Sequence, residues 1–262
     1  MKQYFLIMMT FVSIILQSQN TSTSSEAPML QMTGFAIFLE GGVKPLRTDQ
    51  STLYFHYVDE SPSRDNITEV FDMPSSMYSA SLRLGAEYEF PTPFFVKLQL
   101  EGYLAKISGF SIDGGIGYAI KNKKKTFSVR PQLLVSSGLT TLKLGDIYQN
   151  DLYIEVNGTQ FYSNSVATSL RSRYLLLIPQ LECATRVSDN LELRFSAELP
   201  LPISKGDPYV YFSGADRSNN QVDATESITA PNMDLYLNSN QLRSQNINFT
   251  FPGFHVGLAY KF

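Results

Sequence analysis

The sequence predicts an all-β fold, an antiparallel up-and-down barrel of eight strands. Three observations support this prediction. Eight runs of the chain alternate apolar and polar residues with a period of two, as β-strands with one buried face do. Short turns and long connections join these runs, and the last run ends on an aromatic residue, Phe262. No segment has a convincing helical period.

The eight runs are assigned from alternation alone. The second run shows the pattern best, and the last run also alternates without a break, with an apolar residue at every second position from 254 to 262. Closure of the barrel requires this run to pair with the first run near residues 35–40. Pro131 and Pro179 lie inside predicted strands, where each removes a ladder hydrogen bond, so we expect bulges there. The predicted strands cover residues 30–43, 78–90, 95–107, 110–121, 126–143, 173–187, 191–199 and 248–262.

The lengths of the connections indicate a barrel that crosses a membrane. Short turns on one rim and long loops on the other are typical of transmembrane barrels, with the turns in the periplasm and the loops outside the cell. The connection between the third and fourth runs is also short and departs from this order. The short turns are residues 91–93, 122–125 and 188–190, and the long connections are residues 44–77, 144–172 and 203–246.

Two other architectures remain open. A soluble calyx of the lipocalin type also has eight strands, with an apolar inside and a charged outside. Extra strands within the long loops would raise the count to ten. Aromatic residues near the short turns favour the membrane barrel, because they would form a girdle at the lipid–water interface. These residues are Tyr88, Phe90, Phe94, Phe95, Phe127, Tyr260 and Phe262.

The first residues have the features of a secretory signal peptide. Lys2 precedes an apolar run too short to span a bilayer as a helix, which needs about 20 residues. We expect a signal peptide at residues 1–19 with cleavage between about 17 and 25, a polar periplasmic spacer at 20–29, and the barrel domain at 30–262. No later segment is apolar and long enough for a transmembrane helix.

Composition excludes several classes of function. Charged residues make up 17% of the chain and the net charge is −3, so there is no basic footprint for nucleic acid. The single cysteine, Cys183, excludes a disulfide framework and a cysteine-rich metal site. No motif for a phosphate, dinucleotide or metal is present. We therefore expect no cofactor and no metal ion.

If the apolar faces contact lipid, the polar faces fill the lumen with charges of both signs. An eight-stranded barrel has an interior just wide enough for side chains, so these charges must pair. The pairing predicts a salt-bridge plug; a charged conduit or proton path is the alternative. The expected lumen network consists of Arg83, Glu87, Glu101, Arg130, Glu182, Arg186, Glu192, Arg194 and Glu198.

Candidates for catalysis are few. His255 is predicted to face the lumen, and His56 lies in the first long loop. A lipid-modifying barrel enzyme would need a histidine beside a serine and an acid. Gly257 follows His255 on the same face, and Ser196 with Glu198 lies on the seventh run. The sequence therefore favours a protein that is not an enzyme, with no catalytic residue assigned.

The long loops contain the features that suggest binding. Asn157-Gly158 between alternating runs predicts a β-hairpin. The loops are also dense in aromatic residues, which would pack on each other or on a partner. The candidate partner-binding residues are Tyr54, Phe55, Tyr57, Tyr153, Phe161, Tyr162, Tyr209, Tyr211, Phe212 and Tyr236.

The strands SLRLGAEYEF and NLELRFSAEL, the proline-interrupted VRPQLLVSSG and the ending GLAYKF together resemble the outer-membrane β-barrel (porin-like) family of Bacteroidota, small eight-stranded type. The resemblance implies a place in the bacterial outer membrane, with lipid around the barrel. It also implies that the assembly machinery recognises the closing strand, with Tyr260 and Phe262 as the signal. No catalytic residues carry over from the family.

Three functions follow as hypotheses. The first is a non-enzymatic barrel, structural or accessory to an envelope complex, that binds a partner or ligand through its long extracellular loops, other envelope proteins being candidate partners. The second is an enzyme that modifies outer-membrane lipid, as an acyl hydrolase or transferase. The third is a small solute or ion channel.

Overall fold

The computed structural model describes residues 34–47, 51–58, 60, 66–73, 76–148, 153–237, 240–241 and 252–262. The predicted signal peptide and periplasmic spacer lie outside the described residues. No described helix is long and apolar enough to cross a bilayer.

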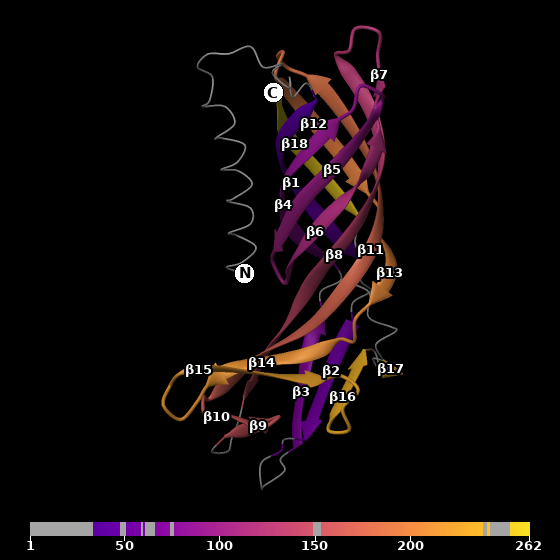
Figure 1. The fold of residues 1–262 in the computed structure, drawn as a ribbon. Coiled ribbons are helices and arrows are strands. Elements are labelled where there is room, and N and C mark those ends of the chain that lie inside the picture. Colours follow the sequence, from indigo (N-terminus) through magenta and orange to yellow (C-terminus); the bar gives the residue numbers. More distant parts are fainter. Residues whose placement is uncertain are drawn as a thin grey trace. The chain divides into compact units, whose positions relative to one another are not determined.

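Antiparallel pairings among the described residues close a ring of eight strands, in the order β1-β4-β5-β6-β8-β11-β12-β18 and back to β1 (Figure 1). This confirms the predicted antiparallel barrel fold. The short β7 (Ile120–Lys121) pairs with β8, and β13 (Leu201–Lys205) pairs with β11. The ring strands are β1 (Phe35–Arg47), β4 (Ser76–Glu89), β5 (Phe94–Leu104), β6 (Ile107–Tyr118), β8 (Phe127–Tyr148), β11 (Ser165–Arg186), β12 (Leu191–Glu198) and β18 (Gly253–Lys261).

The closing strand pairs with the first strand, as predicted. Ala36 lies opposite Lys261, and the register continues to Val43 opposite Phe254. The backbone N–H of Phe262 donates to the carbonyl of Phe35 at 3.1 Å. The three predicted short turns and both chain ends of the barrel therefore meet at one end, called here the short-turn end.

The predicted bulges at Pro131 and Pro179 are wrong. The β8–β11 register runs evenly past both prolines and shifts instead between Thr168 and Ser169. Each proline lies opposite an interruption in a neighbouring strand, Pro131 opposite the break between β6 and β7 and Pro179 opposite the break between β12 and β13. A missing N–H costs no ladder bond where the neighbour has already left the ladder.

The barrel is apolar outside and polar inside, the reverse of a water-soluble domain. Along β5 exposed and buried residues alternate strictly. Leu98 is 60% exposed, whereas its neighbour Lys97 is 3% exposed. The same alternation continues in β4 and β12, where leucines face out and arginines and glutamates face in. This arrangement excludes the soluble calyx, whose charged face would be the outer one.

The three long connections contain further strands, of which the sequence pattern predicts one hairpin. β8 and β11 are each 22 residues long and extend past the other ring strands into this region. We call the folded connections, with the ends of β8 and β11, the loop domain. Its strands are β2 (Ser51–Val58), β3 (Asn66–Met73), β9 (Ile154–Val156), β10 (Thr159–Phe161), β14 (Tyr209–Ala215), β15 (Gln221–Ser227), β16 (Met233–Leu237) and β17 (Asn240–Gln241).

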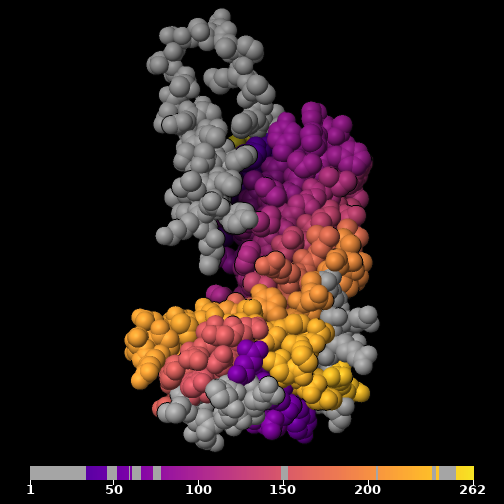
Figure 2. Space-filling view, turned by 60° about the horizontal axis from the view of Figure 1, so that its bottom comes forward, coloured from indigo at the N-terminus to yellow at the C-terminus, as the bar shows by residue number. Residues whose placement is uncertain are grey.

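Two small sheets and one extension of the barrel wall form the loop domain. β17, β16, β2 and β3 form one sheet, β9 and β10 form the predicted hairpin, and β14 with β15 pairs onto β11. Asn157 and Gly158 make the hairpin turn with φ angles of 47° and 73°, the left-handed values that favour these two residue types. Figure 2 shows the indigo, red and orange-yellow segments of these strands packed together on one face.

A single hydrophobic cluster joins the loop domain to the barrel end. Phe55, Phe161 and Phe212 come from three different connections and are fully buried in it. Tyr103 and Ile107, from the β5–β6 hairpin of the barrel, belong to the same cluster. The loop domain is therefore continuous with the barrel and covers it at the end opposite the short turns.

Candidate functional site

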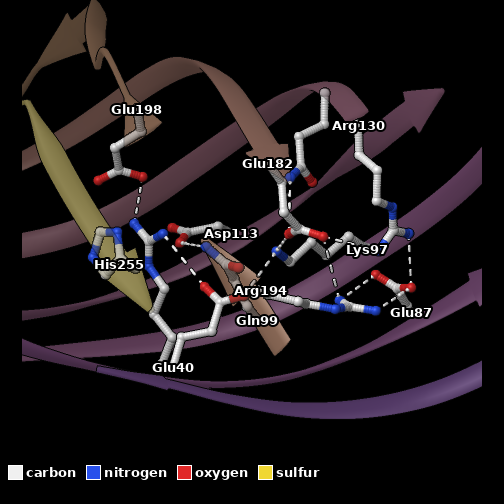
Figure 3. Close-up of polar contacts among 12 residues, drawn as sticks. Glu40, Glu87, Lys97, Gln99, Asp113, Arg130, Glu182, Arg194, Glu198 and His255 are labelled. Atoms are coloured by element: carbon white, nitrogen blue, oxygen red, sulfur yellow. Dashed lines mark hydrogen bonds and ion pairs between the residues drawn. The ribbon is translucent and has the colours of Figure 1, made fainter. Parts of the chain in front are cut away.

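The barrel interior is filled by two linked groups of ion pairs (Figure 3). The first group surrounds Glu101 and Glu198. The Lys44 ammonium lies 2.7 Å from a Glu101 oxygen and 3.2 Å from a Glu198 oxygen. The Arg83 guanidinium pairs with the same two carboxylates. All four side chains are buried, so each charge depends on the others for compensation.

The second group surrounds Glu87 and Glu182. Arg194 pairs with Glu87 through two bonds of 2.8 Å, and Arg130 reaches the same glutamate at 2.7 Å. Arg130 also donates to Glu182 at 2.9 Å, and Lys97 donates to Glu182 at 3.0 Å. These residues come from β4, β5, β8, β11 and β12, so the pairs tie opposite walls of the barrel together.

Glu40 on β1 connects the two groups. Its carboxylate oxygens lie 3.9 Å from Arg83 and 3.8 Å from Lys97, and neither makes a hydrogen bond within the described structure. Asp113 has one oxygen bonded to Gln99 at 2.8 Å and one without a partner there. Buried polar atoms are normally satisfied by protein or water. The interior thus has polar atoms free to bind ordered water between the ion pairs.

A serine, a histidine and a glutamate meet in the first group. Ser81 Oγ lies 2.9 Å from His255 Nε2, and a Glu101 oxygen lies 3.3 Å from the same nitrogen. His255 Nδ1 has no hydrogen-bond partner in the described residues. In a catalytic triad the serine hydroxyl bonds one ring nitrogen of the histidine and the acid bonds the other. Here both groups contact one nitrogen, so the arrangement lacks the triad's relay.

Ligand atoms of Glu101, Glu198 and His255 lie within 4.8 Å of one another. Oxygen and imidazole ligands of this kind suit a divalent cation. However, Lys44 and Arg83 already occupy these carboxylates. A divalent cation would have to displace two buried cations. The geometry therefore fits a salt bridge better than a metal site.

Eight of the nine predicted lumen-network residues are buried inside the barrel, and each has an ion-pair partner. The exception is Arg186. It lies on the predicted face of β11 but at the short-turn end, where its side chain is exposed. The strand ends at Arg186, so the barrel wall no longer covers its side chain.

Several interior residues were not in the predicted network. Lys44 was assigned to the first long loop, yet β1 continues through it, with Ala36, Phe38, Glu40 and Lys44 on the inner face. The even spacing of these residues was the signal that extends the strand. The Phe38 ring lies inside the barrel with the Lys97 ammonium 4.3 Å from its centroid.

A layer of hydroxyl groups lies between the ion pairs and the loop domain. Tyr103 Oη is 2.7 Å from Thr140 Oγ1 and 3.1 Å from Tyr174 Oη. Tyr103 belongs to the hydrophobic cluster of the loop domain on one side, and the Lys44 ammonium lies 5.2 Å from its ring centroid on the other. Side-chain contacts therefore continue from the ion pairs to the core of the loop domain.

The predicted partner-binding aromatic residues separate into two sets. Phe55, Tyr57, Phe161 and Phe212 are fully buried and pack in the loop-domain core. Tyr54 is 44% exposed. The remaining predicted residues are half-buried: Tyr153, Tyr162, Tyr209, Tyr211 and Tyr236.

A polar cluster lies where β14 and β15 join β11. The Arg171 guanidinium stacks 3.3 Å from the centroid of the Tyr211 ring. A hydrogen bond from Tyr211 lowers the pKa of the Asp223 carboxyl below its usual range, and Ser213 adds a second bond at 2.7 Å. Burial and the Asp223 charge raise the pKa of Tyr211. Asp223 therefore stays ionised and Tyr211 neutral at ordinary pH.

No protein-family model and no curated protein matches the chain. Among solved structures, the chain is similar to a major outer membrane protein from Thermus thermophilus, with 13% identity over 87% of this chain and 99% of that chain and a TM-score of 0.46. It is also similar to the outer membrane protease OmpT from Escherichia coli, with 9% identity over 93% and 100% and a TM-score of 0.29. The β domain of the Bordetella autotransporter BrkA matches with 11% identity over 88% and 100% and a TM-score of 0.30.

Proposed function

We propose that this protein is a non-enzymatic barrel of the bacterial outer membrane whose loop domain binds a partner or ligand outside the cell, as a structural or accessory subunit of an envelope complex. The observation that carries the proposal is the folding of three long connections into one domain with a common core. Loops that only joined strands would not need buried residues such as Phe55, Phe161 and Phe212.

The outer-membrane location rests on the inverted barrel. Leucines and valines cover its outer face while arginines and glutamates lie inside. Exposing this apolar surface to water would be unfavourable by about 25 cal/mol for each Å². Contact with lipid avoids this cost. A closed barrel can span a bilayer because each strand is hydrogen-bonded on both sides and no backbone edge is left unpaired. The short-turn end then faces the periplasm and the loop domain faces outward.

The interior supports a structural barrel over a transporting one. Buried ion pairs and the Tyr103–Tyr174 layer fill the lumen, and the loop domain covers its outer end. Transport would require several of these pairs to separate, and breaking one buried pair costs about 3–5 kcal/mol. The activity of such a protein lies in its exposed domain.

The outer face of the β16–β2–β3 sheet is the best candidate surface for a partner. Tyr54 lies directly opposite Val70 on one side and Tyr236 on the other. Tyr54 and Val70 are 44% and 52% exposed. Exposed tyrosines beside an apolar residue are typical of interface centres. Asp72 and Asp234 on the neighbouring strands give this sheet an acidic margin.

Site-specific photo-crosslinking in intact cells tests the proposal. A photoreactive phenylalanine analogue replaces Tyr54, and the matched control replaces Arg217, which is exposed in the turn between β14 and β15. We expect a discrete adduct from position 54 that disappears when Val70→Asp is added, and none from position 217. The complex-subunit proposal would be contradicted by two results together: no adduct from position 54, and purification of the protein as a solitary monomer after extraction in mild detergent.

The lipid-modifying enzyme is the second candidate, because Ser81 and Glu101 both contact His255. The three side chains are buried beneath the barrel wall, out of reach of an acyl chain. Replacing His255, Ser81 and Ser196 by alanine, one at a time, separates the two functions. We expect an unchanged lipid A profile in each strain. A loss of one modified lipid species in the His255→Ala strain would support the enzyme instead.

A further inference from the structure

The short-turn end has a small open hollow of about 40 Å³. Four cationic side chains line it: Lys121, Lys125, Arg186 and Lys261. Glu192 is the carboxylate among the lining residues. The hollow opens beside the basic turn between β7 and β8, at the end of the barrel away from the loop domain.

Two of the four cations have carboxylate partners. Lys121 pairs with Glu89, and Lys261 lies 2.6 Å from a Glu192 oxygen and 3.5 Å from a Glu89 oxygen. Arg194 also reaches Glu192, at 3.3 Å. The carboxylates at the hollow are therefore already shared among cations.

The other two cations are not compensated. Arg186 lies directly opposite Glu192 in the β11–β12 register, but Glu192 is held by Lys261 and Arg194. Within the described part of the chain, neither Arg186 nor Lys125 has an ion-pair partner. Two of the four cations that line this small hollow therefore have no carboxylate partner among the described residues.

The backbone fixes Lys125 at the hollow. The Asn122 side chain accepts hydrogen bonds from the backbone N–H groups of Thr126 and Phe127, at 2.8 and 3.2 Å, and the Lys125 N–H donates to the Asn122 carbonyl. Lys125 has a φ of 55°, a left-handed conformation that is uncommon for a residue with a side chain. Its position is therefore set by the turn and not by a carboxylate.

We propose that this hollow binds a phosphate group. A guanidinium matches two phosphate oxygens at once, and an ammonium adds a point charge beside it. Two unbalanced positive charges match a phosphate monoester, which carries close to two negative charges at neutral pH. A carboxylate would neutralise one of them and leave the other unpaired.

The phosphate has two possible sources, which share this chemistry. Aromatic residues surround the short-turn end, with ring pairs between Phe35 and Phe262 and between Phe94 and Tyr118. Such residues lie at the lipid headgroup level in membrane barrels. A lipid whose headgroup is a phosphate monoester and a soluble phosphate ester can therefore both reach the hollow, and the experiment separates them.

Binding measurements on the full-length mature protein test the proposal. Glycerol 3-phosphate is titrated by calorimetry onto protein in octyl glucoside, and retention of phosphatidic acid, a lipid whose headgroup is a phosphate monoester, is measured by native mass spectrometry from nanodiscs. The variant is Lys125→Gln with Arg186→Gln. The matched control is Lys123→Gln with Lys124→Gln, which removes the same charge from exposed positions of the same end that do not line the hollow.

We expect the variant to bind the phosphate probe at least about tenfold more weakly and the control to bind like the wild type, since each bond to a charged group contributes at least that factor. Binding of glycerol 3-phosphate identifies a soluble ligand, and retention of phosphatidic acid alone identifies a lipid. Equal weakening in variant and control, or no binding of either probe at millimolar concentration, would overturn the proposal. These results do not depend on whether the loop domain binds a partner.

Discussion

Arg194 and Glu87 form a two-pronged ion pair across the barrel interior, with both N–O distances at 2.8 Å. Arg130 binds the same glutamate from β8, so Glu87 compensates two buried guanidiniums. We expect Glu87→Leu to destabilise the barrel by about 3–5 kcal/mol, because removing one partner leaves uncompensated buried charge. Urea unfolding in detergent micelles, followed by tyrosine fluorescence, measures the change.

The matched control for this pair is Glu69→Leu on β3, a half-buried glutamate of the loop domain with no ion-pair partner in the described residues. Its effect on barrel unfolding should be below about 0.5 kcal/mol, as for surface substitutions. Equal effects at Glu87 and Glu69 would show that the interior pairs contribute little to stability.

The barrel fold was predictable because a membrane imposes strict alternation on each strand. Ser79, Arg83 and Glu87 follow one parity along β4, and the leucines between them follow the other. The pairing partners were only partly predictable: Glu101 lies opposite Arg83 on the next strand, but Glu198 comes from β12, which is far away in the sequence. Alternation identifies which residues face the lumen; the ring order and the tilt of the strands decide which of them meet.

The loop domain was the least predictable part. Its strands are short, and their contacts join segments such as 51–58 and 233–237 that lie far apart in the chain. The hairpin at Asn157-Gly158 was predictable because two residues determine its turn. The aromatic density of the loops indicated packing, but only the tertiary structure separates buried Phe55 from exposed Tyr54 on the same strand.

This separation predicts different effects for a buried and an exposed aromatic residue of the loop domain. Phe212 is fully buried and lies 5.6 Å from the Tyr57 ring, whereas Tyr54 is 44% exposed. We expect Phe212→Ala to destabilise the loop domain by about 3–5 kcal/mol through the cavity it leaves. Tyr54→Ala should change its stability by less than about 0.5 kcal/mol.

Limited proteolysis of whole cells measures both effects. The Phe212→Ala protein should be cut in the loop domain at protease concentrations that leave the wild type and Tyr54→Ala intact. The barrel fragment should keep its heat-modifiable migration in electrophoresis, because the ion pairs lie outside the affected core. Equal resistance of all three proteins would contradict the assigned core.

The terminal residue gives a prediction about assembly. Phe262 contacts Phe35 and Tyr260 through ring distances of 5.7 and 5.0 Å. We expect Phe262→Ser to lower the amount of folded barrel in the outer membrane at least about fivefold, a loss equivalent to about 1 kcal/mol or more. The control is Phe90→Ser, an exposed aromatic residue of the same end that contacts Tyr88. Quantitative immunoblotting of the heat-modifiable band compares them, and equal losses would exclude a special role for the terminus.

Acid should weaken the junction of β14 and β15. The hydrogen bond from Tyr211 lowers the pKa of Asp223 from its ordinary value of 3.8, so the ionised carboxylate favours the folded state. This contribution is complete above the ordinary pKa and is lost as the pH falls through the lower pKa of the folded protein. The effect is small because Asp223 is largely exposed.

Hydrogen exchange of the β15 amides, corrected for intrinsic rates, measures this dependence. Protection in the wild type should decrease between pH 5 and pH 2 relative to Asp223→Asn, whose side chain does not titrate. The amides of β12, on the far side of β11, serve as the internal reference. A parallel decrease in both proteins would assign the pH dependence to other groups.

The filled lumen predicts a barrel that does not conduct. Lys44, Arg83 and their glutamates occupy the interior next to the Tyr103–Tyr174 layer, and the loop-domain core continues from that layer. An ion would need to replace buried pairs that already compensate one another, which is costly in a medium of low dielectric constant. Planar-bilayer recordings of the purified wild type should therefore show no stable conductance steps. Tyr103→Ala should remain closed as well, because the ion pairs still fill the barrel below the layer. Reproducible conductance steps with the wild-type protein, absent from bilayers without protein, would contradict the ion-pair plug and favour the channel hypothesis.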